Sequence, residues 1–220
     1  MLEIVIGNKA YSSWSMRGWL AVKQSGLPFT ETLIPMWTPE WDAARATGPL
    51  ALSGKVPTLI DDGLTVWDSL AIVEHLAEQV GPAPFWPADP AARALARSIA
   101  AEMHSAYPDL RRHCGMNVRR VYPATPLPDA VQADIDRIIH LWTEARTRFG
   151  GDGPWLFGAY GAADILFAPV ATRFRTYSIA LPPVAEAYVT ALLAHPHVAD
   201  WLAAAQTEPW FVDKYEVAPA

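Results

Sequence analysis

The chain has 220 residues, of which 51% are hydrophobic and 18% are charged, and its formal net charge is −6. This composition excludes a disordered chain and suits a globular protein of one large domain or two small ones. The acidic balance argues against a general nucleic-acid binder, and a single cysteine, Cys114, excludes an internal disulfide.

The chain carries no signal that directs it to a membrane or out of the cell. No apolar run reaches the length of a membrane span, and the first residues, MLEIVIGN, lack the basic region of a signal peptide. We therefore expect a soluble cytoplasmic protein. The six histidines are scattered and no CxxC motif occurs, so we expect no metal site, and we expect Cys114 to be a buried, inert thiol.

The first third of the chain alternates strands and helices. Leu2 to Ile6 is a short β-branched run typical of a buried strand, and Phe29 to Ile34 predicts a second strand. Between them a helix is predicted from about Ser12 to Gln24, since a Ser-rich start is followed by apolar periodicity and ends at Gly26. A short helix to about Thr47 should begin at Thr38-Pro39, a cap followed by proline.

The stretch from Lys55 to Ser69, KVPTLIDDGLTVWDS, organises this region. Thr58–Ile60 and Leu64–Trp67 are β-prone runs joined by a Gly-containing turn, which predicts an antiparallel hairpin. Asp68-Ser69 then precedes a helical pattern to about Gln79. Strand–helix–strand–helix–hairpin–helix is the order of a small α/β layered domain.

This geometry predicts a ligand. A cis bond before Pro57 would turn the Val56 backbone outward, where a peptide-like molecule could pair with it. The start of the following helix offers free N–H groups to a carboxylate, and Asp68 beside it could accept an ammonium group. A ligand with a peptide backbone, an α-amino group and an α-carboxylate would therefore fit, and the alternative is an ordinary hairpin followed by a capped helix that binds no ligand.

Residues 80–90 are proline-rich and form the clearest boundary, and everything after them reads as helical. The predicted organisation is a domain at 1–79, a linker at 80–90 and an all-helical domain at 91–220. Its expected helices are Ala91 to about Arg120, kinked at Pro108, Asp129 to Phe149, one following Gly161, Pro183 to Ala194 and His197 to Ala205.

Two motifs of the hairpin region resemble the glutathione site of the cytosolic glutathione transferases. They are Val56-Pro57-Thr58-Leu59 and Asp68-Ser69-Leu70-Ala71-Ile72. The resemblance implies a thioredoxin-like N-terminal domain with cis-Pro57, an all-α C-terminal domain, and glutathione as co-substrate. It implies that glutathione is held by Val56 and Pro57 along its backbone and by Asp68 and Ser69 at its γ-glutamyl end. Lys55 is a candidate for the glycine carboxylate, and the alternative is a solvated lysine.

The serines at the first helix resemble the catalytic serine of the zeta, theta and tau classes. Ser12-Ser13-x-x-x-Arg17 matches the zeta pattern, although Trp14 stands where zeta members usually carry cysteine. We favour Ser12 as the residue that faces the thiol, with Ser13 as the alternative, because only one can do so while the other caps the helix. Ser15 lies deeper in the helix.

The second half also carries the resemblance. Gly158 and Asp164 match the Gly-x-x-Ser/Thr-x-x-Asp folding motif of the family, with Gly161 in place of the hydroxyl residue, and Asp164 should cap a helix. Five arginines are candidates for a positive potential in the cleft: Arg111, Arg119, Arg120, Arg173 and Arg175.

The predicted function is a glutathione transferase, in which a serine hydroxyl activates the thiolate for attack on a small electrophile. The alternatives are a non-catalytic glutathione-binding scaffold and a glutathione-dependent isomerase similar to maleylacetoacetate isomerase. The resemblance also implies a homodimer, a prediction that sedimentation velocity can check.

Overall fold

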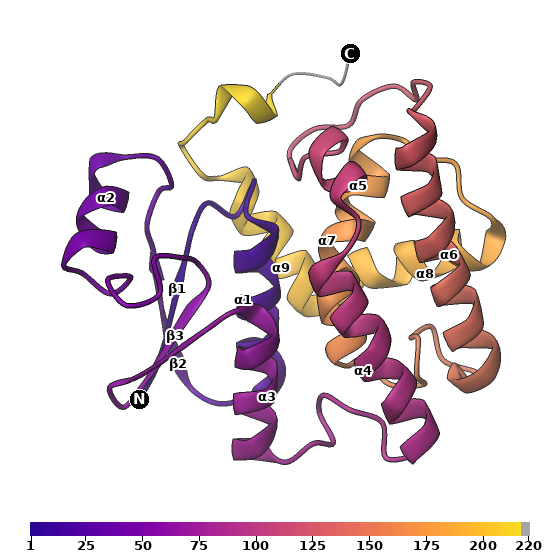
Figure 1. The fold of residues 1–220 in the computed structure, drawn as a ribbon, viewed down its shortest axis with the longest axis horizontal. Helices are drawn as coiled ribbons and strands as arrows, with labels where there is room; N and C mark the ends of the chain where they lie inside the picture. The colour runs from indigo at the N-terminus through magenta and orange to yellow at the C-terminus, as the bar shows by residue number, and fades with distance from the viewer. Residues whose placement is uncertain (217–220) are drawn as a thin grey trace.

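Four strands form one mixed sheet in the first part of the chain (Figure 1). The computed structural model, which describes residues 1–216, has the strand order β2-β1-β3-β4. β1 (Leu2–Ile6) pairs in parallel with β2 (Phe29–Leu33) and antiparallel with β3 (Thr58–Asp61). β4 (Leu64–Trp67) completes the predicted hairpin with β3.

Helices cover both faces of this sheet. α1 (Ser13–Ser25) and α3 (Ser69–Val80) lie side by side on one face, and α2 (Pro39–Ala46) lies on the other (Figure 1). In β1, Ile4 belongs to the main core while Val5 packs in a second cluster on the α2 side. A central strand buried on both faces explains the continuous apolar run. This is the expected thioredoxin-like arrangement, here called the N-terminal lobe (β1 to α3).

The remaining elements are helical and are here called the helical lobe. They are α4 (Pro90–Ser105), α5 (Pro108–His113), α6 (Asp129–Phe149), α7 (Ala162–Thr176), α8 (Pro183–Ala194), α9 (Pro196–Gln206) and the 3₁₀ turn η1 (Asp213–Tyr215). In α7 every residue except Arg175 is buried. α7 packs against α1, and Arg17 Nε donates to the Leu166 carbonyl at 2.9 Å, so the central helix of one lobe is joined to the other.

The prediction of one kinked helix from Ala91 to Arg120 is wrong. α4 ends at Ser105, and a separate short helix begins at Pro108. Tyr107 adopts φ 65°, outside the helical region. Proline clashes with a helical conformation of the residue before it, and it is well suited to the first position of a new helix. The local effect of Pro108 is therefore a break rather than a bend.

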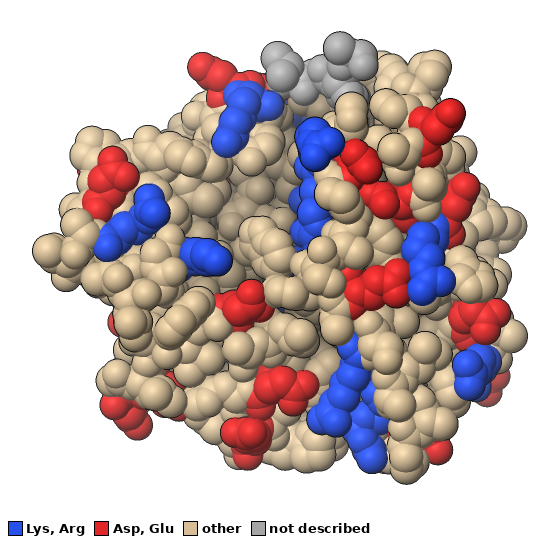
Figure 2. All heavy atoms as spheres, viewed as in Figure 1, with Lys and Arg blue, Asp and Glu red and all other residues tan. Residues whose placement is uncertain are grey.

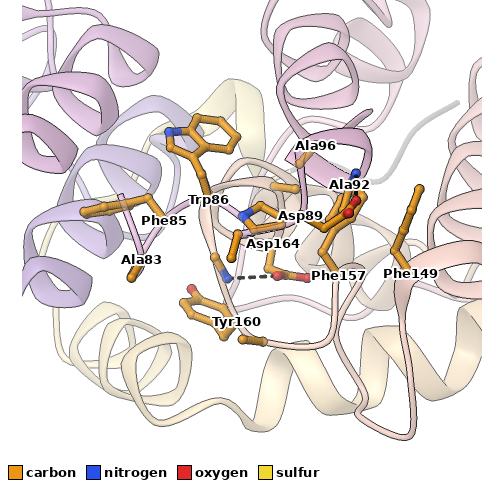
Figure 3. A pocket seen from close by; sticks show the side chains of 16 residues that line it. Ala83, Phe85, Trp86, Asp89, Ala92, Ala96, Phe149, Phe157, Tyr160 and Asp164 are labelled. Atoms are coloured by element: carbon orange, nitrogen blue, oxygen red, sulfur yellow. Dashed lines mark hydrogen bonds between the residues drawn. The ribbon is translucent and has the colours of Figure 1, made fainter. Parts of the chain in front are cut away.

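The start of α7 is built around a buried carboxylate, as predicted. Asp164 accepts hydrogen bonds from the Gly161 N–H at 3.0 Å and the Leu156 N–H at 3.3 Å, and from the Tyr188 hydroxyl at 2.9 Å. Figure 3 shows Asp164 beside a cavity that Tyr160 also lines. A Cβ atom at position 161 would lie 2.7 Å from the Phe85 carbonyl oxygen. This contact explains glycine in place of the hydroxyl residue.

Within residues 1–216 we find no helix that is both long enough and apolar enough to span a bilayer.

Candidate active site

A cavity of about 490 Å³ lies between the two lobes and is here called the hairpin cavity. Figure 2 shows this face of the molecule hollowed between the N-terminal lobe, on the left, and the helical lobe. The cavity brings together six of the seven predicted site residues: Ser12, Lys55, Val56, Pro57, Asp68 and Ser69. Its size is within the range of small-molecule sites, roughly 300–1,000 Å³.

The loop before β3 is held close to α1. The Val56–Pro57 peptide bond is cis, as the resemblance implied. A Cβ atom at position 18 would lie 2.5 Å from Pro57 Cβ, so glycine at position 18 lets the helix approach the loop. Thr58 Oγ1 donates to the Lys55 carbonyl at 2.8 Å and closes the loop from the other side. Lys55 and Val56 are thus presented to the cavity on a constrained backbone.

The start of α3 offers polar groups to the same cavity. Asp68 caps the helix, with Oδ1 accepting from the Leu70 N–H at 3.0 Å. Ser69 is the first helical residue, and its Oγ is buried without a hydrogen-bond partner among residues 1–216. A buried hydroxyl that lacks a partner and lines a cavity is available to a ligand. With the free N–H groups of the helix start, it can bind a carboxylate.

The serines at the start of α1 differ from the prediction that Ser12 faces the thiol while the other serine caps the helix. Ser12, not Ser13, is the N-cap: its Oγ accepts from the Ser15 N–H at 3.2 Å and donates to Ser15 Oγ at 2.8 Å. Ser13 Oγ has no hydrogen bond within the described chain, and Ser13 lines a neighbouring cavity instead. Ser15 is fully buried and accepts from the Gly7 N–H. Ser12 alone of the three lines both cavities.

That neighbouring space of about 250 Å³, here called the arginine cavity, shares Ser12, Trp14 and Met36 with the hairpin cavity. Arg111 from α5 and Arg173 from α7 line it, and Tyr11, Trp37 and Tyr215 supply aromatic walls. Tyr215 is brought there by η1 and stacks on Tyr11, with ring centroids 5.5 Å apart. The two cavities therefore meet at the start of α1.

Both arginines are anchored by backbone carbonyls rather than by carboxylates. Arg173 Nε donates to the Cys114 carbonyl at 2.8 Å and Nη1 to that of Pro169 at 3.2 Å. Arg111 Nε donates to the Ala106 carbonyl at 2.9 Å, and its Nη2 donates to that of Met103. One terminal nitrogen of each guanidinium is left without a partner among the described residues. Burial, reinforced by the charge of Arg111, lowers the pKa of Arg173 to about 10, so it stays protonated at neutral pH.

The other three candidate arginines are engaged elsewhere. Arg119 donates to the carbonyls of Glu208 and Trp210, Arg120 pairs with Glu216 at 2.7 Å, and Arg175 donates to the Val118 carbonyl. None of these three lines either cavity.

Trp14 is flanked by two guanidiniums. The carbon centre of Arg17 lies 4.8 Å from the ring centroid and that of Arg111 lies 5.1 Å from it. Arg17 is completely buried, and both of its terminal nitrogens lack partners within residues 1–216. Burial, with the charges of Arg111 and Arg173, lowers the pKa of Arg17, while Asp68 acts in the opposite direction. The junction of the cavities is consequently rich in positive charge.

Several lining residues were not predicted from the sequence. His104 of α4 reaches the hairpin cavity, together with Trp14, Met36 and Trp41. His104 follows the buried Met103 by one residue and so points to a different side of α4, which left no signal in the sequence pattern. Tyr215 is brought to the arginine cavity by the C-terminal segment, which left no local signal in the sequence.

Two other kinds of site, a metal centre and a reactive thiol, find no support among residues 1–216. Residues 1–216 contain no group of three or more His, Cys, Asp or Glu side chains placed to hold a metal ion. Cys114 is buried, and burial raises the pKa of its thiol to about 11. A reactive thiol needs the opposite shift. The cavity of Figure 3, about 340 Å³ and lined by linker and α7 residues, contains none of the predicted site residues.

Comparison with known proteins agrees with this geometry. Residues 11–79 match the family model described as glutathione S-transferase, N-terminal domain. A probable maleylacetoacetate isomerase of Caenorhabditis elegans is 36% identical over 87 residues, which span 40% of this chain and only 39% of that relative.

Solved structures extend the similarity to both lobes. A glutathione transferase homologue from Burkholderia, crystallised with bound glutathione, superposes with a TM-score of 0.69 at 23% identity, over 94% of this chain and 99% of that one. A theta class glutathione S-transferase from Xanthomonas axonopodis pv. citri, also with glutathione bound, gives a TM-score of 0.63 at 25% identity, over 91% and 96%. The chain thus has the fold of the glutathione transferases, and its residues 11–79 match the N-terminal domain of the glutathione S-transferase family.

Proposed function

We propose that this chain is a glutathione-dependent transferase, which binds glutathione in the hairpin cavity and an electrophile in the arginine cavity. The observation that carries the proposal is the meeting of the two cavities at Ser12, the cap of α1. Two adjoining sites that share one hydroxyl suit a reaction in which a bound thiolate attacks a second molecule. A scaffold that only binds glutathione would need no second cavity there.

In this proposal the tripeptide is recognised by its ends and its backbone. The Val56 backbone pairs with the central peptide group, beside Pro57, and Lys55 binds the glycine carboxylate. Asp68 accepts the α-ammonium of the γ-glutamyl group. Ser69 and the start of α3 bind its carboxylate, because the unpartnered Ser69 hydroxyl lines the cavity at that point.

Glutathione binding tests the proposal directly. Calorimetric titration should show binding to the wild type and an affinity about tenfold to a hundredfold lower in Ser69→Ala, the cost of one hydrogen bond to a charged carboxylate. Ser69→Ala should leave the unfolding midpoint in place, because this hydroxyl has no partner in the described structure. Ser98→Ala, on the exposed face of α4, is the matched control. Absence of binding at millimolar glutathione would refute the proposal, and binding without turnover of any electrophile would favour the scaffold.

A glutathione-dependent isomerisation is the second candidate. The 36% identity to a probable maleylacetoacetate isomerase favours it, although that match covers 40% of this chain. An isomerase returns glutathione unchanged after the thiolate has added to the substrate, so both readings use the same glutathione site. Recovery of free thiol after turnover separates isomerisation from conjugation.

We expect the second substrate to carry a carboxylate. The free guanidinium nitrogens of Arg111 and Arg173 have no carboxylate partner in residues 1–216, and a carboxylate would supply the missing charge. Arg173→Met should lower kcat/KM for 4-chloro-3-nitrobenzoate about tenfold more than for the neutral 1-chloro-2,4-dinitrobenzene. Arg173→Lys, which keeps the charge, should restore part of the difference. Equal effects on the two electrophiles would contradict the expectation.

A further inference from the structure

His104 reaches from the helical lobe into the glutathione site proposed above. It lies near the end of α4 and lines the hairpin cavity together with Ser12, Asp68 and Ser69, which all belong to the other lobe. Its Nε2 lies 3.3 Å from Asp68 Oδ2, while Asp68 Oδ1 is taken by the Leu70 N–H. The two carboxylate oxygens thus face groups of two different helices, α3 and α4.

The surroundings of the ring determine which nitrogen carries the proton. Trp14 packs its ring against His104 at 70°, with centroids 5.1 Å apart, which limits rotation of the imidazole. Nδ1 is buried and has no partner among residues 1–216, whereas Nε2 faces a carboxylate. In the neutral ring the proton therefore belongs on Nε2, on the edge that faces the Asp68 carboxylate.

We propose that His104 is a positioning residue for glutathione: its Nε2 edge lies against the Asp68 carboxylate and keeps it turned toward the incoming α-ammonium group, and its protonated form competes with that ammonium for Asp68. The inference rests on the proposed function, since it assumes that Asp68 receives the γ-glutamyl ammonium. Neutral His104 leaves the charge of Asp68 available. The imidazolium neutralises that charge and weakens the attraction of the carboxylate for a second cation.

The charged groups around His104 set the direction of the effect. Asp68 at the start of α3 is the acidic neighbour, and Arg17 from α1 and Arg111 from α5 are the basic ones. Burial lowers the pKa of His104 below its ordinary value of 6.5, the two arginines reinforce this, and Asp68 opposes it. Free protein therefore keeps His104 neutral at pH 7 and protonates it progressively as the pH falls below about 6.5. Glutathione affinity should fall over that same range.

Proton release measures this competition. Glutathione binding should expel the His104 proton, so at pH between 5 and 6 the calorimetric heat should depend on the ionisation enthalpy of the buffer. S-methylglutathione is the appropriate probe, because it lacks a thiol that could release a proton of its own. We expect the wild type to release protons on binding in acidic buffer, more of them as the pH is lowered, and to release none at pH 7.5.

Two substitutions distinguish the effect of His104 on the orientation of Asp68 from the effect of its protonation. His104→Gln keeps an N–H donor without a titrating group, so it should abolish proton release while the affinity at pH 7.5 stays within about twofold of wild type. His104→Leu should also abolish release, and it should raise the KM for glutathione about fivefold, with a smaller effect on kcat, the size expected for a partly exposed pair. His75→Gln is the matched control, because His75 makes a similar 3.0 Å pair with Asp61 outside the cavity.

The outcomes are distinguishable from failure of the proposed function. If the wild type binds S-methylglutathione but the release of protons is unchanged in His104→Gln, the inference is overturned and the proposed function stands. If the wild type binds neither glutathione nor its S-methyl derivative, both are overturned. Wild-type release that is lost in His104→Gln and kept in His75→Gln supports the inference.

Discussion

Replacement of Ser12 by alanine is expected to return the pKa of bound glutathione's thiol toward its free value, about 8.5. A thiol with that pKa is only about 3% ionised at pH 7, and lowering it by about two requires roughly 2.7 kcal/mol of preference for the anion. A hydrogen bond to a charged acceptor supplies about 1.5–3 kcal/mol and a helix N-terminus about 0.3–2 kcal/mol. Loss of the hydroxyl should therefore slow conjugation at pH 6.5 by roughly tenfold to a hundredfold.

The capping role of Ser12 is compatible with this chemistry. A hydroxyl has one proton to donate and two lone pairs that accept. Ser12 uses a lone pair for the Ser15 N–H, and its proton, donated to Ser15 Oγ in this structure, can turn to a thiolate in the hairpin cavity. Ser15 Oγ would keep its bond from the Gly7 N–H. One serine can thus cap α1 and activate the thiol together.

Suitable variants separate the two roles of Ser12. Ser12→Gly removes the hydroxyl but costs only a few tenths of a kcal/mol as a cap, and Ser12→Thr retains both functions. The pKa of the bound thiol, followed by thiolate absorbance, should rise in Ser12→Ala and Ser12→Gly and remain low in Ser12→Thr and Ser13→Ala. A rise in Ser13→Ala alone would reverse the assignment, and a rise in neither serine variant would remove the serine mechanism.

The features that sequence reasoning located are those with local physical causes. Thr38 caps α2 with Pro39 at its first position, Gly26 ends α1 at φ 71°, and the Gly63 turn joins β3 to β4. Each depends on a few neighbouring residues whose conformational preferences agree with the fold. The hairpin between Thr58 and Trp67 and the helix start at Asp68-Ser69 are confirmed for the same reason, and together they supply several residues of the hairpin cavity.

The features that sequence reasoning missed depend on contacts between distant segments. His104 reaches Asp68 only because α4 packs across the cavity from α3. Five arginines were equal candidates for the cleft, and only tertiary packing aims Arg111 and Arg173 into it. Spacing along a helix gives the face a residue lies on but not the partner that the face meets. The break at Tyr107, by contrast, has a local cause, Pro108. It was missed because the helical periodicity on both sides of it suggested one continuous helix.

The largest loss of stability should follow Asp164→Ala, because this substitution leaves three donors, two of them fully buried, without an acceptor. Tyr188 and Leu156 are fully buried, and the Gly161 N–H begins α7. An unpaired buried donor costs about 1–3 kcal/mol, and since the three share one site we expect a total of about 3–5 kcal/mol. A domain of ordinary stability, about 5–15 kcal/mol, would lose a large part of it. Chemical denaturation should show this loss, while a Ser98→Ala control on exposed α4 stays near wild type.

The pH dependence of the unfolding free energy provides a second test of Asp164, and its direction follows from the pKa of the carboxyl. Burial raises the pKa of Asp164 to about 6, although the hydrogen bonds from Tyr188, Gly161 and Leu156 act to lower it. Between about pH 4 and 6 the folded protein thus holds a proton that the unfolded chain has lost, and this contribution to stability disappears as the pH rises through 6. Asp164→Asn cannot titrate, so its deficit in unfolding free energy relative to wild type should be larger at pH 4 than at pH 7. A deficit that is independent of pH would mean that the folded carboxyl titrates at its ordinary value, and that the hydrogen bonds cancel the cost of its burial.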